Sequence, residues 1–153
     1  MKKSRIGIRG IFTMVVRKNG VIVEEIREEN KIVDSALTNL AHLIAGDVTS
    51  RSITHIAFGT SGTAPAAGDT FLEDQYSRLI DGFEYIDNNK VVFDWHLPYN
   101  EYNGKAILEF GLLTENGQLF ARKVREDPVF KAADIDVGGG WIIEFYPEEE
   151  EEE

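Results

Sequence analysis

Two of the three Asn-Gly pairs in this chain, at positions 19–20 and 116–117, constrain its fold more than any other feature of its sequence. Each pair lies between two runs of β-forming residues, the first within 11–26 and the second between 106–113 and 118–124. Tight hairpin turns need positive φ at their central positions, which Asn and Gly adopt most readily. The sequence therefore predicts two antiparallel hairpins.

Short apolar runs between turn residues predict further strands. Residues 53–58 form one such run, and residues 91–97 alternate apolar with polar side chains, as in a strand that buries one face. Residues 76–86 are expected to be the hairpin partner of that strand. A last strand is expected over 141–145, after the three glycines at 138–140.

One segment, DSALTNLAHLIAG at positions 34–46, has a helical pattern instead. Asp34 or Ser35 can cap its first turn, and Gly46 can end it. The apolar side chains expected to face the core recur at i, i+3, i+4 and i+7: Leu37, Leu40, Ala41 and Ile44.

These patterns together predict a mainly β protein, an antiparallel β-sandwich or barrel of about eight strands with one short α-helix. A chain of 153 residues is expected to form one domain, here over 1–147. We expect residues 1–10 to be a basic N-terminal arm of that domain and residues 148–153, all glutamate, to be an acidic tail.

Charge is distributed unevenly along the chain. Beyond residue 31 there are 8 basic and 23 acidic residues, which would repel a nucleic-acid backbone, so no nucleic-acid partner is expected. The two charged ends are either plain solubilising termini or complementary surfaces, with the arm of one copy meeting an acidic surface of the next. Residues 1–18 carry six basic side chains and no acidic one: Lys2, Lys3, Arg5, Arg9, Arg17 and Lys18.

Several classes of function are disfavoured by composition and spacing. The chain has no cysteine, which excludes disulfides, thiolate metal sites and cysteine nucleophiles. His42, His55 and His96 are not spaced as metal ligands. No D-x-D-x-D-G calcium loop is present, and a calcium site among the many acidic residues is left open by the sequence. No apolar run approaches membrane-spanning length, so we expect a soluble protein without a membrane partner and without a cofactor.

The stretch ITHIAFGTSGTAPAAGDTFL, residues 53–72, could be a glycine-rich phosphate loop or a shaped surface loop. A phosphate loop needs G-x-x-x-x-G-K-[ST] leading into a helix. Gly68 is followed by Asp69 instead, and no lysine lies between Lys31 and Lys90. We therefore expect the loop to shape an interface, with Asp69 and Thr70 forming local hydrogen bonds.

No catalytic set emerges from the acidic residues and histidines. Glu109 and Glu144 interrupt apolar strands, and both are expected on a solvent-facing side of the sheet. His55 is expected to be packed or hydrogen-bonded, and His96 to face solvent. We therefore expect a protein that is not an enzyme.

Aromatic residues raise the alternative of a carbohydrate-binding module. Trp95 and Trp141 fall on the apolar faces of their strands and are expected in the core. Tyr99 and Tyr102, in the irregular loop PYNEYNG, are better placed for a binding surface, so a glycan is an alternative partner.

The order of these features resembles a family of small proteins from tailed-phage and prophage morphogenesis clusters. In that family an I-A-h-G-T-G-x-T-A-P-x-x-x-D-T-x-L loop, where h is apolar, precedes an E-x-G-L-F-x-x-x-G-x-L-h-A-R hairpin and a last W-x-I-x-F-like strand. The resemblance covers roughly residues 30–146, although Ser61 and Gly62 depart from the simpler Gly-x of the family loop. The matching residues are Ile56-Ala57-Phe58-Gly59-Thr60, Thr63-Ala64-Pro65, Asp69-Thr70, Leu72, Phe110-Gly111-Leu112, Gly117, Leu119 and Ala121-Arg122.

The resemblance implies a structural protein of a tailed-bacteriophage virion, present in the host cytoplasm during assembly. A tail, fibre-base or adaptor position is expected, and a capsid decoration protein on the phage head is the alternative. The expected partners are further copies of the chain, in a homo-oligomer, and other virion proteins. Candidate interface residues are Lys2, Lys3, Arg5, Arg9, Gly59, Thr60, Ser61, Gly62, Pro65, Asp69, Thr70, Tyr99 and Tyr102.

Overall fold

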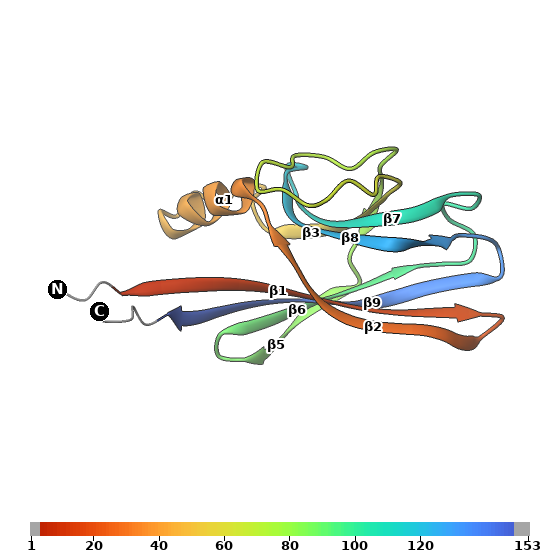
Figure 1. Cartoon of the computed structure of the whole chain (residues 1–153). Coiled ribbons are helices and arrows are strands. Elements are labelled where there is room, and N and C mark those ends of the chain that lie inside the picture. The colour runs from red at the N-terminus through yellow and green to blue at the C-terminus, as the bar shows by residue number, and fades with distance from the viewer. Residues whose placement is uncertain (1–3, 149–153) are drawn as a thin grey trace, which may run out of the picture.

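The computed structural model describes residues 4–148 and confirms a mainly β fold with one short helix (Figure 1). It has nine strands where the sequence predicted about eight, because the expected strand over 76–86 is two strands. Within the described residues, no helix is long and apolar enough to cross a membrane. The elements are β1 (Arg5–Lys18), β2 (Val21–Ile32), α1 (Asp34–Ile44), β3 (Ile53–Gly59), β4 (Tyr76–Leu79), β5 (Gly82–Asp87), β6 (Lys90–Leu97), β7 (Ala106–Thr114), β8 (Leu119–Phe130) and β9 (Ile135–Glu148).

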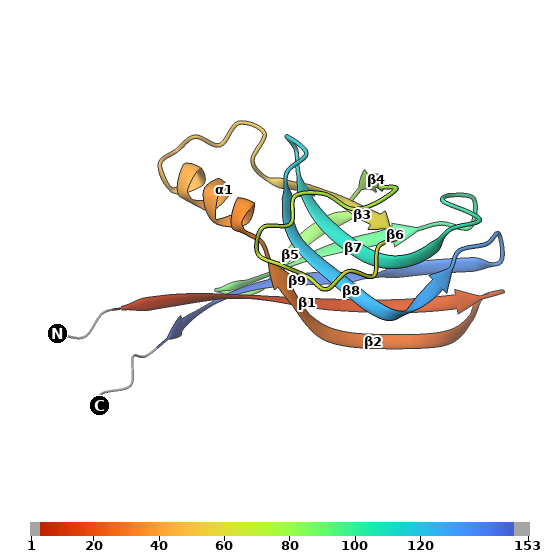
Figure 2. The ribbon, with the colours of Figure 1, turned by 45° about the horizontal axis from the view of Figure 1, so that its top comes forward.

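The strands form one antiparallel sheet in the order β4-β3-β7-β8-β2-β1-β9-β6-β5, and this sheet folds over on itself as a sandwich. We call β2-β1-β9-β6-β5 the lower sheet and β4-β3-β7-β8 the upper sheet (Figures 1 and 2). β2 joins them because only its last residues, Lys31 and Ile32, pair with β8. The sheet is not closed, since β4 and β5 lie at opposite ends of the strand order.

Both predicted hairpins are present, and aromatic residues between the two sheets lie at the centre of the core. Phe12 of β1 stacks on Trp95 with ring centroids 5.6 Å apart, and it meets Trp141 edge-on at 5.0 Å. Phe110 of β7 lies 4.8 Å from Phe12, so the lower and upper sheets meet at this ring. The prediction that both tryptophans are core residues is confirmed.

Helix α1 has the predicted span, but only part of the predicted inward face is correct: Leu40 packs against the core, whereas Ala41 is exposed. Its buried residues are Ala36 and Asn39, whereas Leu37 and Ile44 are 55% and 89% exposed. The helix packs against the polar β7–β8 turn, where the Asn39 amide donates to Gln118 Oε1 at 2.7 Å. A polar partner therefore sets the rotation of the helix, and the apolar period alone does not.

The ends of α1 also differ in part from expectation. Neither Asp34 nor Ser35 caps the first turn, because the N-cap position is Val33 and has no side-chain hydrogen bond. The Ser35 hydroxyl donates instead to the carbonyl oxygen of Leu119 in β8. Gly46 does follow the helix end with a φ of +87°, a conformation that favours glycine.

The three glycines at 138–140 lie inside β9, which begins before them rather than after them. Gly139 pairs with Met14 of the central strand β1. A Cβ atom at position 139 would lie 1.9 Å from the carbonyl oxygen of Thr13 and 3.0 Å from the Trp95 ring. Glycine is therefore required here by the close approach of two backbones.

We predict that Gly139→Ala destabilises the fold by about 3 kcal/mol or more, because the added methyl group meets backbone that cannot move aside. Urea denaturation of the purified variant measures this loss. Gly82→Ala, at a strand position with open space and no positive φ, is the matched control and should stay close to the parent chain. Equal stability of the two variants would contradict the prediction.

Candidate functional site

The glycine-rich segment that leaves β3 at Gly59 and returns at Tyr76 lies across the outer face of the upper sheet (Figure 1). We call residues 60–75 the covering loop. Leu72 anchors it, being buried in a small apolar cluster outside the main core. The other members of that cluster are Val33, Ala57, Leu113 and Leu119.

A buried ion network fastens the covering loop to the hairpin beneath it. Arg122 of β8 donates from Nε to Glu109 Oε1 at 3.1 Å and from Nη1 to Asp69 Oδ2 at 3.0 Å. Glu109 comes from β7 and its side chain is 1% exposed. We call Glu109, Arg122 and Asp69 the loop clamp.

The clamp also satisfies backbone donors of the loop. Glu109 Oε2 accepts the N–H groups of Ser61 at 2.5 Å and Glu73 at 3.2 Å, and Asp69 Oδ2 accepts that of Ala66 at 2.9 Å. At Gly59 an added Cβ would lie 2.7 Å from Glu109 Cγ, so the glutamate passes directly over this glycine. The expectation that Glu109 faces solvent is therefore wrong, because the covering loop buries that face of the sheet.

The structure brings together the predicted loop residues Gly59, Thr60, Ser61, Gly62, Pro65, Asp69 and Thr70. Residues 62–68 are exposed, while Asp69 turns inward to the clamp and forms the local hydrogen bond that the sequence predicted. Phe71 is a large exposed apolar residue beside them that the sequence analysis did not single out. The covering loop therefore presents a surface of small residues, and the loop clamp fixes its conformation.

We predict that Glu109→Gln lowers the free energy of unfolding by about 3 kcal/mol, because it removes one partner of a buried ion pair and leaves Arg122 undercompensated. Hydrogen exchange at the Ser61 and Glu73 amides should accelerate in the same variant. Glu144→Gln is the control, since Glu144 lies 3.9 Å from a half-exposed Arg9, and its cost should be below about 1 kcal/mol. Unchanged exchange at Ser61 would contradict the clamp.

The second predicted loop, around Tyr99 and Tyr102, does not present the two rings together. Tyr102 has a φ of +57°, its ring stacks on Tyr76 at 5.4 Å, and its hydroxyl donates to the Asp74 carbonyl oxygen at 2.7 Å. Tyr99 is the exposed member of the pair. Tyr102 thus ties this loop to the end of the covering loop.

Buried Lys131 holds the same loop from the other side. Its ammonium group donates to Asn103 Oδ1 at 2.8 Å and to the carbonyl oxygens of Tyr99 and Ala132 at 3.3 Å. Burial lowers the pKa of Lys131, and the carboxylates of Asp136, Glu101 and Asp134 act against that shift. Three oxygen acceptors around one ammonium group fix the loop conformation.

Burial, with the nearby Asp74 and Glu109 carboxylates, raises the pKa of Tyr102 from 10.0 to about 12. The unfolded chain therefore loses this proton at lower pH than the folded chain, so the contribution of Tyr102 to stability is complete below pH 10 and is lost toward pH 12.

We predict that Tyr102→Phe removes the highest-pH step of the tyrosinate absorbance titration and flattens the loss of stability across that window. Tyr99→Phe is the matched control and should keep that step. An unchanged titration in Tyr102→Phe would contradict the assignment.

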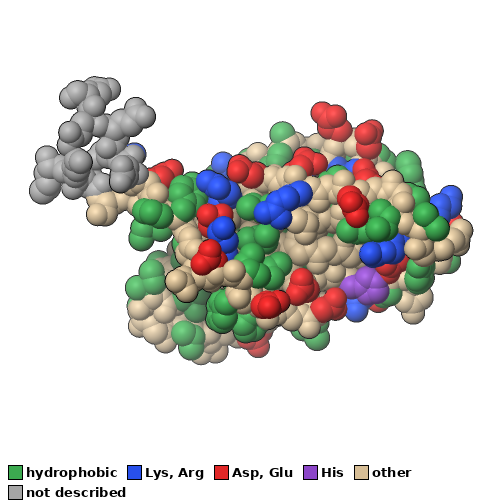
Figure 3. Space-filling view, turned by 90° about the horizontal axis from the view of Figure 1, so that it is seen from below, with side chains coloured by type: hydrophobic (Ala, Val, Ile, Leu, Met, Phe, Trp, Pro, Cys, Tyr) green, Lys and Arg blue, Asp and Glu red, His purple; other side chains and the backbone are tan. Residues whose placement is uncertain are grey.

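The predicted basic arm is largely a strand. Residues 5–10 belong to β1, which pairs with both β2 and β9, so they are not a free extension. Arg9 lies 3.5 Å from Glu29 and 3.9 Å from Glu144, and its guanidinium sits 4.7 Å from the Tyr146 ring centre. Arg5 lies opposite Glu148 in the register. Figure 3 shows acidic and basic side chains interspersed over this outer face of the lower sheet.

Two parts of the charge prediction lie outside the described residues. Lys2 and Lys3 precede them, and the acidic tail beyond Glu148 follows them. Their proposed role as interface residues therefore stays a prediction.

The histidines considered as chemical groups are engaged in local pairs. His96 Nε2 contacts Asp136 Oδ1, and His55 Nδ1 lies 2.7 Å from the Thr54 hydroxyl. Among residues 4–148 no group of three or more His, Asp or Glu side chains is arranged to hold a metal ion.

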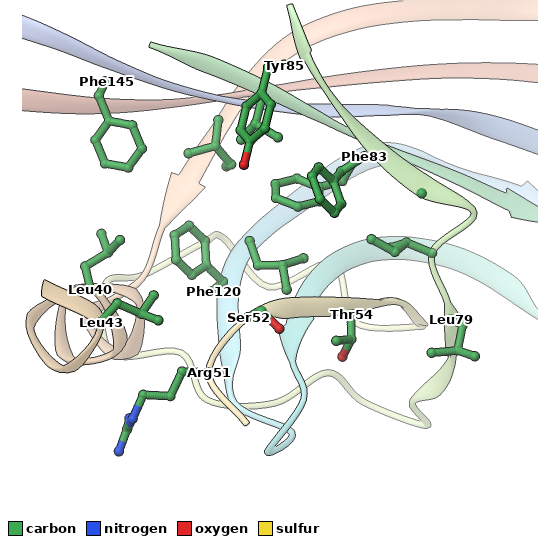
Figure 4. Close-up of a pocket in the computed structure, with 16 residues that line it drawn as sticks. Leu40, Leu43, Arg51, Ser52, Thr54, Leu79, Phe83, Tyr85, Phe120 and Phe145 are labelled. Carbon is green, nitrogen blue, oxygen red and sulfur yellow. The ribbon is translucent and has the colours of Figure 1, made fainter. Parts of the chain in front are cut away.

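An apolar groove that the sequence analysis missed opens between α1 and the lower sheet (Figure 4). Its volume is about 570 Å³, and its walls come from elements far apart in the sequence, which is why no local pattern predicts it. Leu40 and Leu43 line it from α1, and Arg51, Ser52 and Thr54 lie along its rim. The opposite wall includes Phe83, Tyr85, Phe93 and Phe145.

Comparisons of the chain with protein-family models, with curated proteins and with solved structures found no match. The resemblance to phage morphogenesis proteins therefore rests on its motifs. Both motifs contribute to the loop clamp: Asp69 comes from the first, and the second begins at Glu109 and ends at Arg122.

Proposed function

We propose that this chain is a non-enzymatic structural subunit of a tailed-bacteriophage particle, placed in the tail, the fibre base or an adaptor. The loop clamp is the observation that carries the proposal. Glu109 and Arg122 are buried beneath the covering loop and bind its residue Asp69, so their role is to hold the shape of the loop. A shaped, prearranged surface is what a subunit in a repeating assembly needs.

The energetics of the clamp favour this interpretation. A buried ion pair adds little net stability compared with apolar packing, but it penalises arrangements that leave a charge unpaired. A loop that is already ordered loses little conformational entropy when it meets a partner, so more of the contact energy remains for binding. The covering loop therefore suits repeated, identical contacts between virion proteins.

The same surface would also serve a capsid decoration protein, which is the alternative position in the particle. The carbohydrate-binding alternative has less support, because Tyr102 uses its ring and its hydroxyl within the chain. Tyr99 alone offers one exposed ring for stacking on a sugar.

The proposal predicts that the chain is present in gradient-purified particles of the phage or prophage that encodes it. Mass spectrometry of separated tails and heads measures its position: we expect it with the tails, whereas recovery with expanded heads would identify a decoration protein. Absence from intact particles would contradict a virion role altogether.

A surface variant tests the role of the covering loop in the same particles. Thr63→Glu, on the exposed part of the loop, should reduce incorporation without lowering the melting temperature. Thr49→Glu, exposed outside the covering loop, is the control and should be incorporated like the parent chain. Normal incorporation of Thr63→Glu would contradict the loop as the contact.

A further inference from the structure

The apolar groove is an open end of the core between the two sheets. Figure 1 shows the lower sheet running on toward the ends of the chain, past the upper sheet, with α1 above it. Phe93 lies two residues before the buried Trp95 on β6, and Ile143 and Phe145 follow Trp141 at the same spacing on β9, so each shares the inward face of its strand. The groove therefore continues the space that aromatic side chains fill further along the sandwich.

The wall of the groove that faces α1 is apolar and open to solvent. Phe83 and Tyr85 of β5 are 60% and 77% exposed, and Leu79 of β4 is 65% exposed. Glu84 lies between the two aromatic residues and points to the other side of the strand, because successive side chains alternate. Exposed apolar side chains around a hollow are typical of a binding site, and about 570 Å³ is within the usual size of small-molecule sites.

The polar groups of the groove are all on its opposite rim, and Arg51 is the only charged one among the described residues that line it. Arg51 Nη1 donates to Asn39 Oδ1 at 3.1 Å, and Nη2 lies 3.5 Å from Asp47 Oδ2. The Nε–H group of Arg51 is buried without a hydrogen-bond partner, which is costly for a donor removed from water. The hydroxyl of the next residue, Ser52, also forms no hydrogen bond within residues 4–148. An acceptor, preferably an anionic one, would satisfy both donors.

The position of these donors sets the shape of the ligand. In Figure 4 the Arg51 side chain lies across the groove from Phe83 and Tyr85, and its guanidinium group is turned away from the apolar lining. An anionic head group held at this rim stays next to water and so avoids most of the cost of burying a charge. The apolar remainder of the ligand would lie between α1 and the lower sheet. One polar end and one apolar end are the features of a single-chain amphiphile.

We propose that the groove binds a medium-chain carboxylic acid. Its carboxylate accepts hydrogen bonds from the Arg51 Nε–H group and the Ser52 hydroxyl, and its alkyl chain packs between Leu43 of α1 and the aromatic rings of Phe83 and Phe93. The inference does not depend on membership of a phage particle, because it rests on the groove alone.

Calorimetric titration of the parent chain with three probes that differ only in the head group tests the proposal. Decanoate, decanol and decyltrimethylammonium are each used below the concentration at which they aggregate. We expect saturable one-to-one binding of decanoate, and binding of the ammonium probe at least ~10-fold weaker, because the only charged group of the lining is a cation. Affinity should rise roughly 4-fold for each methylene group added between octanoate and decanoate.

Variants separate the head contact from the apolar contact. Arg51→Met keeps an apolar stem and removes the charge, so it should bind decanoate about 10-fold more weakly and bind decanol as the parent chain does. Phe83→Glu replaces an exposed side chain of the apolar wall and should bind neither probe. Leu37→Glu, on the exposed side of α1 and outside the groove, is the matched control and should bind both like the parent chain.

Methyl NMR tests the placement directly. Decanoate should shift the methyl signals of Leu43 and Leu79, which line the groove. The methyl signals of Leu119, in the separate cluster beneath the covering loop, should stay in place.

Four outcomes would overturn the proposal. A parent chain that binds none of the probes has no such site, and equal binding of decanoate and the ammonium probe shows that Arg51 does not select the head group. Loss of decanol binding in Arg51→Met, to the same degree as decanoate, shows that Arg51 only maintains the structure of the groove. A parent chain that takes up no probe but self-associates, and loses that association in Phe83→Glu, assigns the groove to a second copy instead.

Discussion

The buried contact between Glu109 and Arg122 decides how the upper half of this molecule is arranged. Two charges of opposite sign are removed from water on the outer face of a sheet, which is tolerable only if every remaining hydrogen-bonding position is filled. Asp69 and the amides of Ser61 and Glu73 fill those positions, and all three come from the covering loop. The ion network is therefore complete only when the covering loop is ordered, so the two form together.

The effect of this contact extends to the helix and the groove. The Asp34 amide donates to the carbonyl oxygen of Ala67 in the covering loop at 2.8 Å, so the loop fixes where α1 begins. The rotation of α1 then places Leu40 and Leu43 over the lower sheet, where they form one wall of the groove. A network on one face of the upper sheet thus shapes a cavity at the end of the sandwich.

Local signals in the sequence predicted the elements, whereas contacts between distant segments determined what the sequence did not reveal. The hairpin at Asn19-Gly20 was predicted correctly because the requirement for positive φ is local, and these residues adopt φ values of 50° and 80°. In the second hairpin Gly117 alone takes this conformation, with a φ of 83°. The prediction that Glu109 faces solvent was wrong because the covering loop that buries it lies far from it along the chain. The charged N-terminus was misjudged because a count of lysines and arginines does not show that residues 5–10 pair with β9.

The distribution of charge on the strand edges bears on how such a sandwich can associate. β5 carries Glu84 and Asp87, and the free side of β2 carries Glu24 and Glu28, which pair with Arg125 and Lys123 of β8. Charged side chains therefore lie along both edges, and charged edge strands oppose open-ended sheet extension.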